Sequence, residues 1–159
     1  MKGCCLIWVG KENRRDPETQ LCDRYFKRIG GFWSIDQRVV KPVSGRGMSV
    51  EEIQKREAER IMAAVAADDF LVVCDERGKE VGSKQLAALL DRWQAMGHKR
   101  LLLLVGGAVG LAEPLRQRAG FMLSLSRMTL PHTLARVVLL EQIYRALCIR
   151  ANHPYHHED

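Results

Sequence analysis

The end of the chain gathers side chains that can exchange protons. His153, Tyr155 and His156 lie close together, with Pro154 among them. Imidazole and phenol groups serve as acids, bases and hydrogen-bond donors in enzyme sites. Two structural interpretations stay open: a solvated terminus, or a packed turn, which the proline and the tyrosine favour. A zinc site is a third interpretation, but the spacing matches no metal motif and no cysteine is near in sequence.

Two loops upstream of this tail could bind a ligand through their backbone. The glycine-rich loop 106–110 follows an apolar run, and its lack of side chains permits close approach of a ligand to the main chain. It does not have the G-x-G-x-x-G spacing of a dinucleotide site, so a tight turn is the alternative. The loop at 124–130 carries three hydroxyl groups that could bind an adenine or a ribose. A simple helix-entry turn is the alternative there.

The hydrophobic pattern predicts the scaffold that positions these groups. Short apolar runs alternate with amphipathic stretches of helical period, which indicates an α/β fold with a mostly parallel sheet flanked by helices, in a single domain of residues 1–159. The run 101–105 is entirely apolar and is expected to be a central strand. In such sheets ligands bind beyond the carboxyl ends of the strands. Three loops are expected there: the charged loop 75–79, the glycine loop and the hydroxyl loop.

The last helix is expected from Pro131 to Arg150 and is apolar nearly all round. Its polar residues do not gather on one face, which is typical of a helix buried on more than one side. In so small a domain, one of these sides is expected to contact a partner subunit. The hydroxyl loop, this helix and the tail are expected to form one site.

Composition narrows the class of protein. The chain has 159 residues, 47% of them hydrophobic, which indicates a soluble globular protein rather than a disordered one. Its net charge of +6 favours a polyanionic partner such as nucleic acid, although many basic proteins bind none. Five cysteines without a C-x-x-C pair indicate a reducing, cytoplasmic location, and no apolar run is long enough to span a membrane. The basic residues that could contact such a partner are Arg14, Arg15, Arg24, Lys27, Arg28, Lys41, Arg46 and Arg127; a solvated surface is the alternative for each.

Four motifs follow one another in the last third of the chain. They are Gly106-Gly107-x-x-Gly110-Leu111, Leu125-Ser126-x-Met128-Thr129-Leu130-Pro131-His132, Glu141-Gln142-Ile143-Tyr144-Arg145-Ala146 and His153-Pro154-Tyr155-His156. Together they resemble the bacterial ribosomal RNA large subunit methyltransferase H family. The resemblance implies a SPOUT fold, an α/β domain with a deep trefoil knot near the C-terminus. It also implies a homodimer in which each cofactor site lies near the subunit interface.

The resemblance further implies an activity and its residues. The expected reaction is methyl transfer from S-adenosylmethionine to N3 of a pseudouridine in 23S ribosomal RNA, within the large subunit or the assembled ribosome. No metal is required. The catalytic candidates, which would remove the N3 proton or stabilise the resulting anion, are His153, Tyr155, His156 and Arg145. The family's cofactor contacts fall on Cys74, where an aliphatic residue is common, and on Gly106, Leu125, Ser126, Arg127, Met128, Thr129 and Leu130.

Two other functions remain open at this point. One is a SPOUT methyltransferase that acts on a different RNA, such as a transfer RNA. The other is a non-catalytic ribosome-binding factor with the same fold. The glycine loop and the intact tail favour an enzyme over a binding factor.

Overall fold

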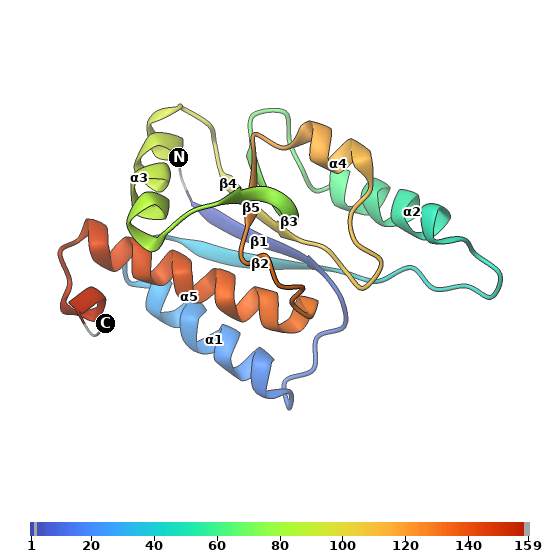
Figure 1. Cartoon of the computed structure of the whole chain (residues 1–159), viewed down its shortest axis with the longest axis horizontal. Helices are drawn as coiled ribbons and strands as arrows, with labels where there is room; N and C mark the ends of the chain where they lie inside the picture. Colours follow the sequence, from blue (N-terminus) through green and yellow to red (C-terminus); the bar gives the residue numbers. More distant parts are fainter. Residues whose placement is uncertain (2, 158–159) are drawn as a thin grey trace.

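The core of the protein is a sheet of five parallel strands (Figure 1). The computed structural model describes residues 1 and 3–157, with the side chains of this part through residue 155. The strand order is β2-β1-β4-β3-β5, and every neighbouring pair is parallel, which confirms the predicted sheet. The strands are β1 (Cys4–Val9), β2 (Ile35–Val40), β3 (Phe70–Glu80), β4 (Leu101–Val105) and β5 (Phe121–Ser124). Strand β4 is buried along its length between β1 and β3, so the expected central strand is confirmed.

Helices cover both faces of the sheet. Because side chains alternate along a strand, Leu6 and Trp8 belong to one core and Ile7 and Val9 to the other. The first core is shared with α1 (Pro17–Gly30), α3 (Ser83–Ala95) and α5 (His132–Arg150), and the second with α2 (Val50–Met62) and α4 (Glu113–Arg118). A short 3-10 helix, η1 (Pro154–His157), follows α5. In the described part of the chain, no helix is long and apolar enough to span a membrane.

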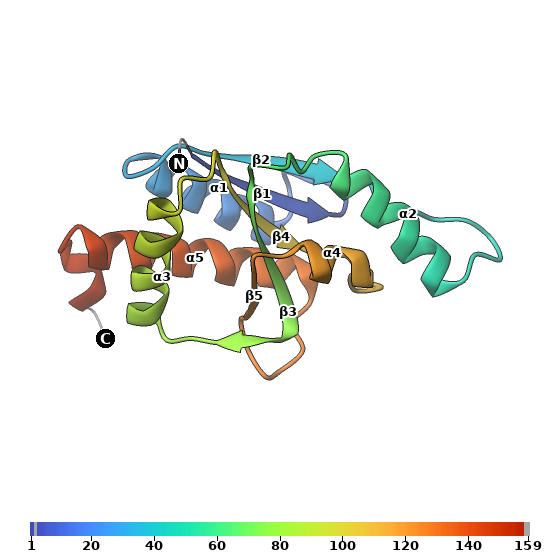
Figure 2. The same ribbon diagram turned by 90° about the horizontal axis from the view of Figure 1, so that it is seen from above.

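Strand β3 is longer than the sequence predicts. Residues 75–79 were expected to form a charged loop, but the strand continues through them to Glu80. It bends between Cys74 and Lys79, and its outer part pairs with β5 before the chain runs on to α3 (Figure 2). A Cβ atom on Gly78 would lie 2.6 Å from the carbonyl carbon of Leu123 and 2.7 Å from the nitrogen of Ser124. The missing side chain therefore allows the outer part of β3 to lie against β5.

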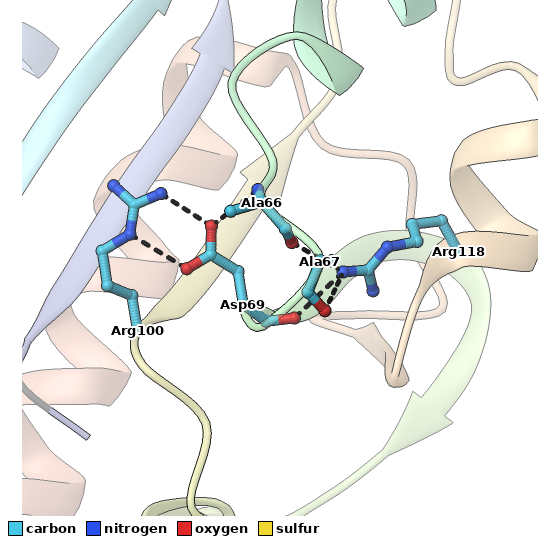
Figure 3. Close-up of polar contacts among 5 residues, drawn as sticks. All are labelled: Ala66, Ala67, Asp69, Arg100 and Arg118. Atoms are coloured by element: carbon cyan, nitrogen blue, oxygen red, sulfur yellow. Dashed lines mark hydrogen bonds and ion pairs between the residues drawn. The ribbon is translucent and has the colours of Figure 1, made fainter.

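The turn between α2 and β3 is held by two arginines (Figure 3). The Asp69 carboxylate is fully buried and accepts hydrogen bonds from Nε and NH2 of Arg100, at 3.0 and 2.6 Å, and from the backbone nitrogen of Ala66. Arg118 donates to the carbonyl oxygens of Ala66, Ala67 and Asp69. Burial alone would raise the pKa of Asp69, but the hydrogen bonds from Arg100 and Ala66 outweigh it, and the pKa lies below its usual value.

Replacing Asp69 by Asn should lower the free energy of unfolding at pH 7 by about 2 kcal/mol, because a buried charged acceptor is lost. A carboxyl whose pKa is lowered by folding stabilises the protein above its unfolded pKa, and this stabilisation disappears as the pH falls through the folded value. The difference between the two proteins should therefore shrink below about pH 4. Denaturant unfolding between pH 3 and pH 7 measures it.

The control for this prediction is Glu52→Gln. Glu52 forms an exposed ion pair with Arg56 within α2, with 46% and 54% of the two side chains exposed. Exposed pairs of this kind contribute about 0.5 kcal/mol or less. If Glu52→Gln changed the pH dependence of the free energy of unfolding as much as Asp69→Asn does, the hydrogen bonds around Asp69 would have no special role in stability.

Candidate active site

A cleft of about 700 Å³ lies beyond the carboxyl ends of β4 and β5, beside the bend in the middle of β3. All three segments that the sequence places at this edge contribute to its lining, as expected for a parallel sheet. Arg127 is exposed and is not among the residues that line the cleft, so its role as a cofactor contact stays a prediction. The predicted residues that do line the cleft are Cys74, Gly106, Leu125, Ser126, Met128, Thr129 and Leu130.

The glycine loop is a tight turn as well as a wall of the cleft. The Gly110 nitrogen donates to the Gly107 oxygen at 3.1 Å, and Gly110 adopts φ +76°, a conformation that favours glycine. A Cβ on Gly106 would lie 2.8 Å from Cγ of Leu111, and one on Gly107 would lie 3.0 Å from Cγ1 of Val9. The loop therefore packs closely on its inner side while its other side borders the cleft.

The hydroxyl loop is held by its own side chains. Ser124 Oγ donates to the Ser126 oxygen at 3.1 Å, and Ser126 Oγ accepts from the Met128 nitrogen at 3.0 Å. Such short-range bonds fix a loop without a regular ladder. The hydroxyls thus organise the backbone of the loop, which is a role the sequence did not distinguish from ligand binding.

Two residues that line the cleft come from helices that the sequence did not associate with the site. Gln54 of α2 donates through Nε2 to the Val109 oxygen at 2.6 Å and so holds the glycine loop. Arg116 of α4 donates through Nε to Asp75 Oδ2 at 2.7 Å. Neither residue belongs to a motif, and only the packing of α2 and α4 beside the sheet edge brings them to the cleft.

Two neighbouring side chains give the cleft its charge. Burial would raise the pKa of Asp75, but hydrogen bonds from the Arg77 nitrogen and from Arg116 lower it overall, so the carboxylate is ionised at neutral pH. Burial and the Asp75 charge raise the pKa of the Cys74 thiol to about 12. Since the thiolate is the nucleophilic form of cysteine, Cys74 offers the cleft a small, neutral and unreactive surface.

The C-terminal tail leaves α5 through a defined turn. The His153 nitrogen donates to the Cys148 oxygen at 2.8 Å and the Asn152 nitrogen to the Ile149 oxygen at 3.1 Å, while Asn152 has φ +52°. This pair of bonds around a left-handed residue is the Schellman ending of a helix. Tyr155 then packs on Tyr144, with ring centres 4.7 Å apart. Of the two conformations that the sequence left open, the structure has the packed turn that Pro154 and Tyr155 favour. The side chain of His156 lies outside the described part of the structure.

Arg145 and Tyr155 meet at Glu141. Arg145 Nε donates to Glu141 Oε1 at 3.0 Å, and the Tyr155 hydroxyl donates to the same oxygen at 3.4 Å. The Arg145 guanidinium lies 5.1 Å from the centre of the Tyr155 ring. Burial, a hydrogen bond with Tyr25 and the Glu141 charge raise the pKa of Tyr155 to about 12. Tyr155 is therefore protonated at neutral pH and acts as a hydrogen-bond donor.

Cleft and tail lie at opposite ends of α5. His132, the first residue of this 19-residue helix, lines the cleft. The tail follows the last residue of the helix, near the C label in Figure 1. A helix of that length extends about 28 Å. The expectation of one combined site is therefore wrong within a single chain: the structure assembles the predicted cofactor residues, but it does not bring the predicted catalytic tail to them.

The chain matches a known family over nearly its whole length. The pattern of the family described as "Predicted SPOUT methyltransferase" matches residues 2–156. The chain belongs to this family. Within it, the chain is 47% identical to ribosomal RNA large subunit methyltransferase H of Syntrophotalea carbinolica and 46% identical to that of Chromobacterium violaceum, in each case over 96% of this chain and 97% of the relative. A relative of the same name from Maridesulfovibrio salexigens is 40% identical over 96% of both chains.

SPOUT methyltransferases use S-adenosylmethionine as methyl donor, and the cleft fits this cofactor. Its volume is in the usual range for small-molecule sites, about 300–1,000 Å³. Val105, Leu111 and Leu125 offer apolar surface to an adenine ring. Asp75 supplies a negative charge to a ligand that carries a cationic ammonium and a sulfonium. These features match the cofactor's chemistry.

Proposed function

We propose that this SPOUT methyltransferase methylates N3 of a pseudouridine in 23S ribosomal RNA, within the large subunit or the assembled ribosome. The observation that carries the proposal is the cleft, where all three strand-end segments meet in a chain whose relatives are named ribosomal RNA large subunit methyltransferase H. Bound there, S-adenosylmethionine supplies an electrophilic methyl group on a sulfonium.

The residues of the chain contribute mainly alignment and charge. The glycine loop and the hydroxyl loop hold the cofactor, and correct alignment of two reactants supplies much of the rate. The N3 proton must leave, and His153 and His156 are the proposed groups that accept it. Tyr155 stays protonated and donates a hydrogen bond to the base or its surroundings. Arg145 supplies positive charge beside the anion that deprotonation creates.

We also propose a homodimer in which the tail of one subunit reaches the cleft of its partner. The length of α5 supports this arrangement, because the tail and cleft of one chain lie at opposite ends of the helix. Exposed apolar side chains near the start of α5 also support it: 77% of Met128 and 42% of Leu134 is accessible. Apolar surface of this kind beside a ligand cleft fits an interface better than free solvent.

The fold within each subunit is proposed to be a single SPOUT domain with a trefoil knot. Strand β5 pairs with both parts of the bent β3, and the chain then enters α5, which packs against α1 and α3. The outer part of β3 therefore crosses close to the segment that leads into α5 (Figure 2). This crossing supports the knot that the family implies.

The RNA-facing surface is proposed to include the exposed face of α1. Arg24 and Lys27 are exposed there, and Arg14 and Arg15 are exposed just before the helix. Cations on one surface attract the phosphates of structured RNA without reading its sequence. No separate RNA-binding module is needed in this arrangement.

A methylation assay tests the proposed function. The protein is incubated with methyl-labelled S-adenosylmethionine and with assembled ribosomes, isolated ribosomal RNA or transfer RNA. We expect label in the 23S RNA of ribosomes, and mass spectrometry of the nucleosides should identify a methylated pseudouridine. Label in transfer RNA would instead assign another RNA substrate. Cofactor binding without transfer to any RNA would contradict the enzymatic proposal.

A further inference from the structure

The tail rests on a cluster of aromatic rings from three parts of the chain. Tyr155 of η1 contacts Tyr144 of α5, which in turn lies 6.2 Å from Tyr25 of α1 and 5.9 Å from Phe32 between ring centres. Phe32 also meets His153 edge-on, with ring centres 6.0 Å apart. These separations and tilts are those of favourable aromatic pairs. The rings of His153 and Tyr155, both predicted to be catalytic, thus pack against this cluster.

Arg28 joins α1 to the same cluster. Its guanidinium carbon lies 5.7 Å from the ring centre of Tyr25, 5.6 Å from that of Tyr144 and 6.0 Å from that of Tyr155. A guanidinium at this distance is attracted to the face of a ring. Within the described residues Arg28 forms no salt bridge, so the ring contacts are what orients it.

The ring contacts add to the hydrogen bonds that hold the tail after the turn at Asn152. These bonds include a 3.4 Å bond from the Tyr155 hydroxyl to Glu141 and a 3.3 Å bond from the Tyr155 nitrogen to His153 Nδ1. Both are long for hydrogen bonds. The ring cluster therefore carries much of the positioning.

We propose that Arg28 and Phe32 are positioning residues that hold Tyr155 and His153 in the geometry in which the tail meets the RNA base. The inference rests on the proposed function, since it assigns these residues to the RNA-facing side of that same site. Phe32 has 40% of its surface exposed and Arg28 is exposed, so RNA can approach both residues. Their effect on the reaction nevertheless passes through the rings of Tyr155 and His153. A displacement of about 1 Å at a reacting group can slow a reaction by up to about 10²-fold.

Steady-state methylation of ribosomes by Arg28→Ala, Arg28→Lys and Phe32→Ala tests this assignment. We expect each to lower kcat by about tenfold while KM for ribosomes and the cofactor Kd stay unchanged. Lysine keeps the charge but not the planar group that covers the rings, so Arg28→Lys should not restore kcat. Phe32→Tyr keeps the ring and should retain wild-type kcat. Lys55→Ala, which removes an exposed cation of α2 that has no ring contact among the described residues, is the control and should retain kcat as well.

A double-mutant cycle with Tyr155→Ala decides whether Arg28 acts through the tail. If it does, the double variant loses no more kcat than Tyr155→Ala alone. Additive losses, a change confined to KM, or rescue by Arg28→Lys would overturn the inference and make Arg28 an RNA contact. If both Arg28 variants kept wild-type kcat while Tyr155→Ala was defective, the inference about Arg28 would be overturned, but the proposed role of the tail would stand. Wild-type kcat in Tyr155→Ala would remove the proposed role of the tail itself. Thermal unfolding of each variant separates these effects from loss of folded protein.

Discussion

Truncation after Ala151 should abolish methyl transfer to ribosomes, with a loss of at least about 10²-fold, while cofactor binding remains. The deletion removes His153 and Tyr155, and the loss of general acid–base groups alone typically costs about 10²- to 10⁴-fold. The cleft should be unaffected because it lies at the other end of α5. A methylation assay on ribosomes and calorimetric titration with S-adenosylmethionine measure the two effects separately.

A chain that ends after His157 is the matched control, because it keeps His153, Tyr155 and His156, and it should remain active. Dimers assembled from two different defective subunits test the proposed site, in which the tail of one subunit reaches the cleft of its partner. The truncated subunit keeps its cleft, and a Gly106→Val subunit, whose new side chain would crowd Leu111, keeps its tail. Co-assembled dimers of the two should regain activity that neither has alone. Wild-type transfer by the truncated protein would show that the tail has no role in the reaction.

Replacing Gly78 by alanine should lower the free energy of unfolding by about 3 kcal/mol and weaken cofactor binding. The added Cβ would lie 2.6–2.7 Å from main-chain atoms of Met122, Leu123 and Ser124, and main-chain atoms cannot rotate away. The outer part of β3 must then separate from β5, and the hydroxyl loop starts directly after Ser124. Denaturant unfolding and calorimetric titration give both quantities.

Gly30→Ala is the comparison for this prediction. No atom lies within 4 Å of a Cβ placed on Gly30, which sits at the end of α1. This change should alter stability by about 1 kcal/mol or less, in the stabilising direction, because alanine favours the helix. If Gly78→Ala lowered the free energy of unfolding no more than Gly30→Ala does, the close approach of β3 and β5 would be refuted.

Much of the fold could be predicted because the strands carry a strong local signal. The runs Cys4–Val9 and Leu101–Val105 are continuously apolar, and both became strands buried on two faces. The extension of β3 could not be predicted in this way. Residues 75–80 are mostly polar and partly or fully exposed, and they become strand only because β5 pairs beside them. Pairing with a segment more than forty residues later leaves no trace in local composition.

The sequence predicted those parts of the candidate site whose residues are adjacent both in sequence and in space. The hydroxyl loop and the glycine loop each act as continuous segments, so their residues could be named in advance. Gln54 and Arg116 could not, because their place in the cleft depends on how α2 and α4 pack. The distance between tail and cleft was also missed. Nearness in sequence suggested one site, but a helix of α5's length holds its two ends far apart.

Burial of Arg136 was equally invisible in the sequence. It lies on α5 among apolar residues, is 3% exposed, and its guanidinium carbon lies 3.5 Å from the centre of the Trp8 ring. Burial lowers its pKa. An arginine in a predicted helix is ordinarily assigned to the solvated face. The Trp8 ring near the end of β1 and the negative charges of Glu18, Glu12 and Asp16, all far away in sequence, help to stabilise the buried guanidinium.

The pairing of β1 with β4 determines when the protein can fold during its synthesis on a ribosome. This ladder joins Cys4 to Leu101, so the centre of the sheet cannot close until about two thirds of the chain has been made. The strand β5 and the helix α5 follow later still, and they complete both the cleft and the core around α1. Contacts between such distant segments slow folding. A nascent chain whose α5 is still inside the exit tunnel therefore lacks a finished cofactor site.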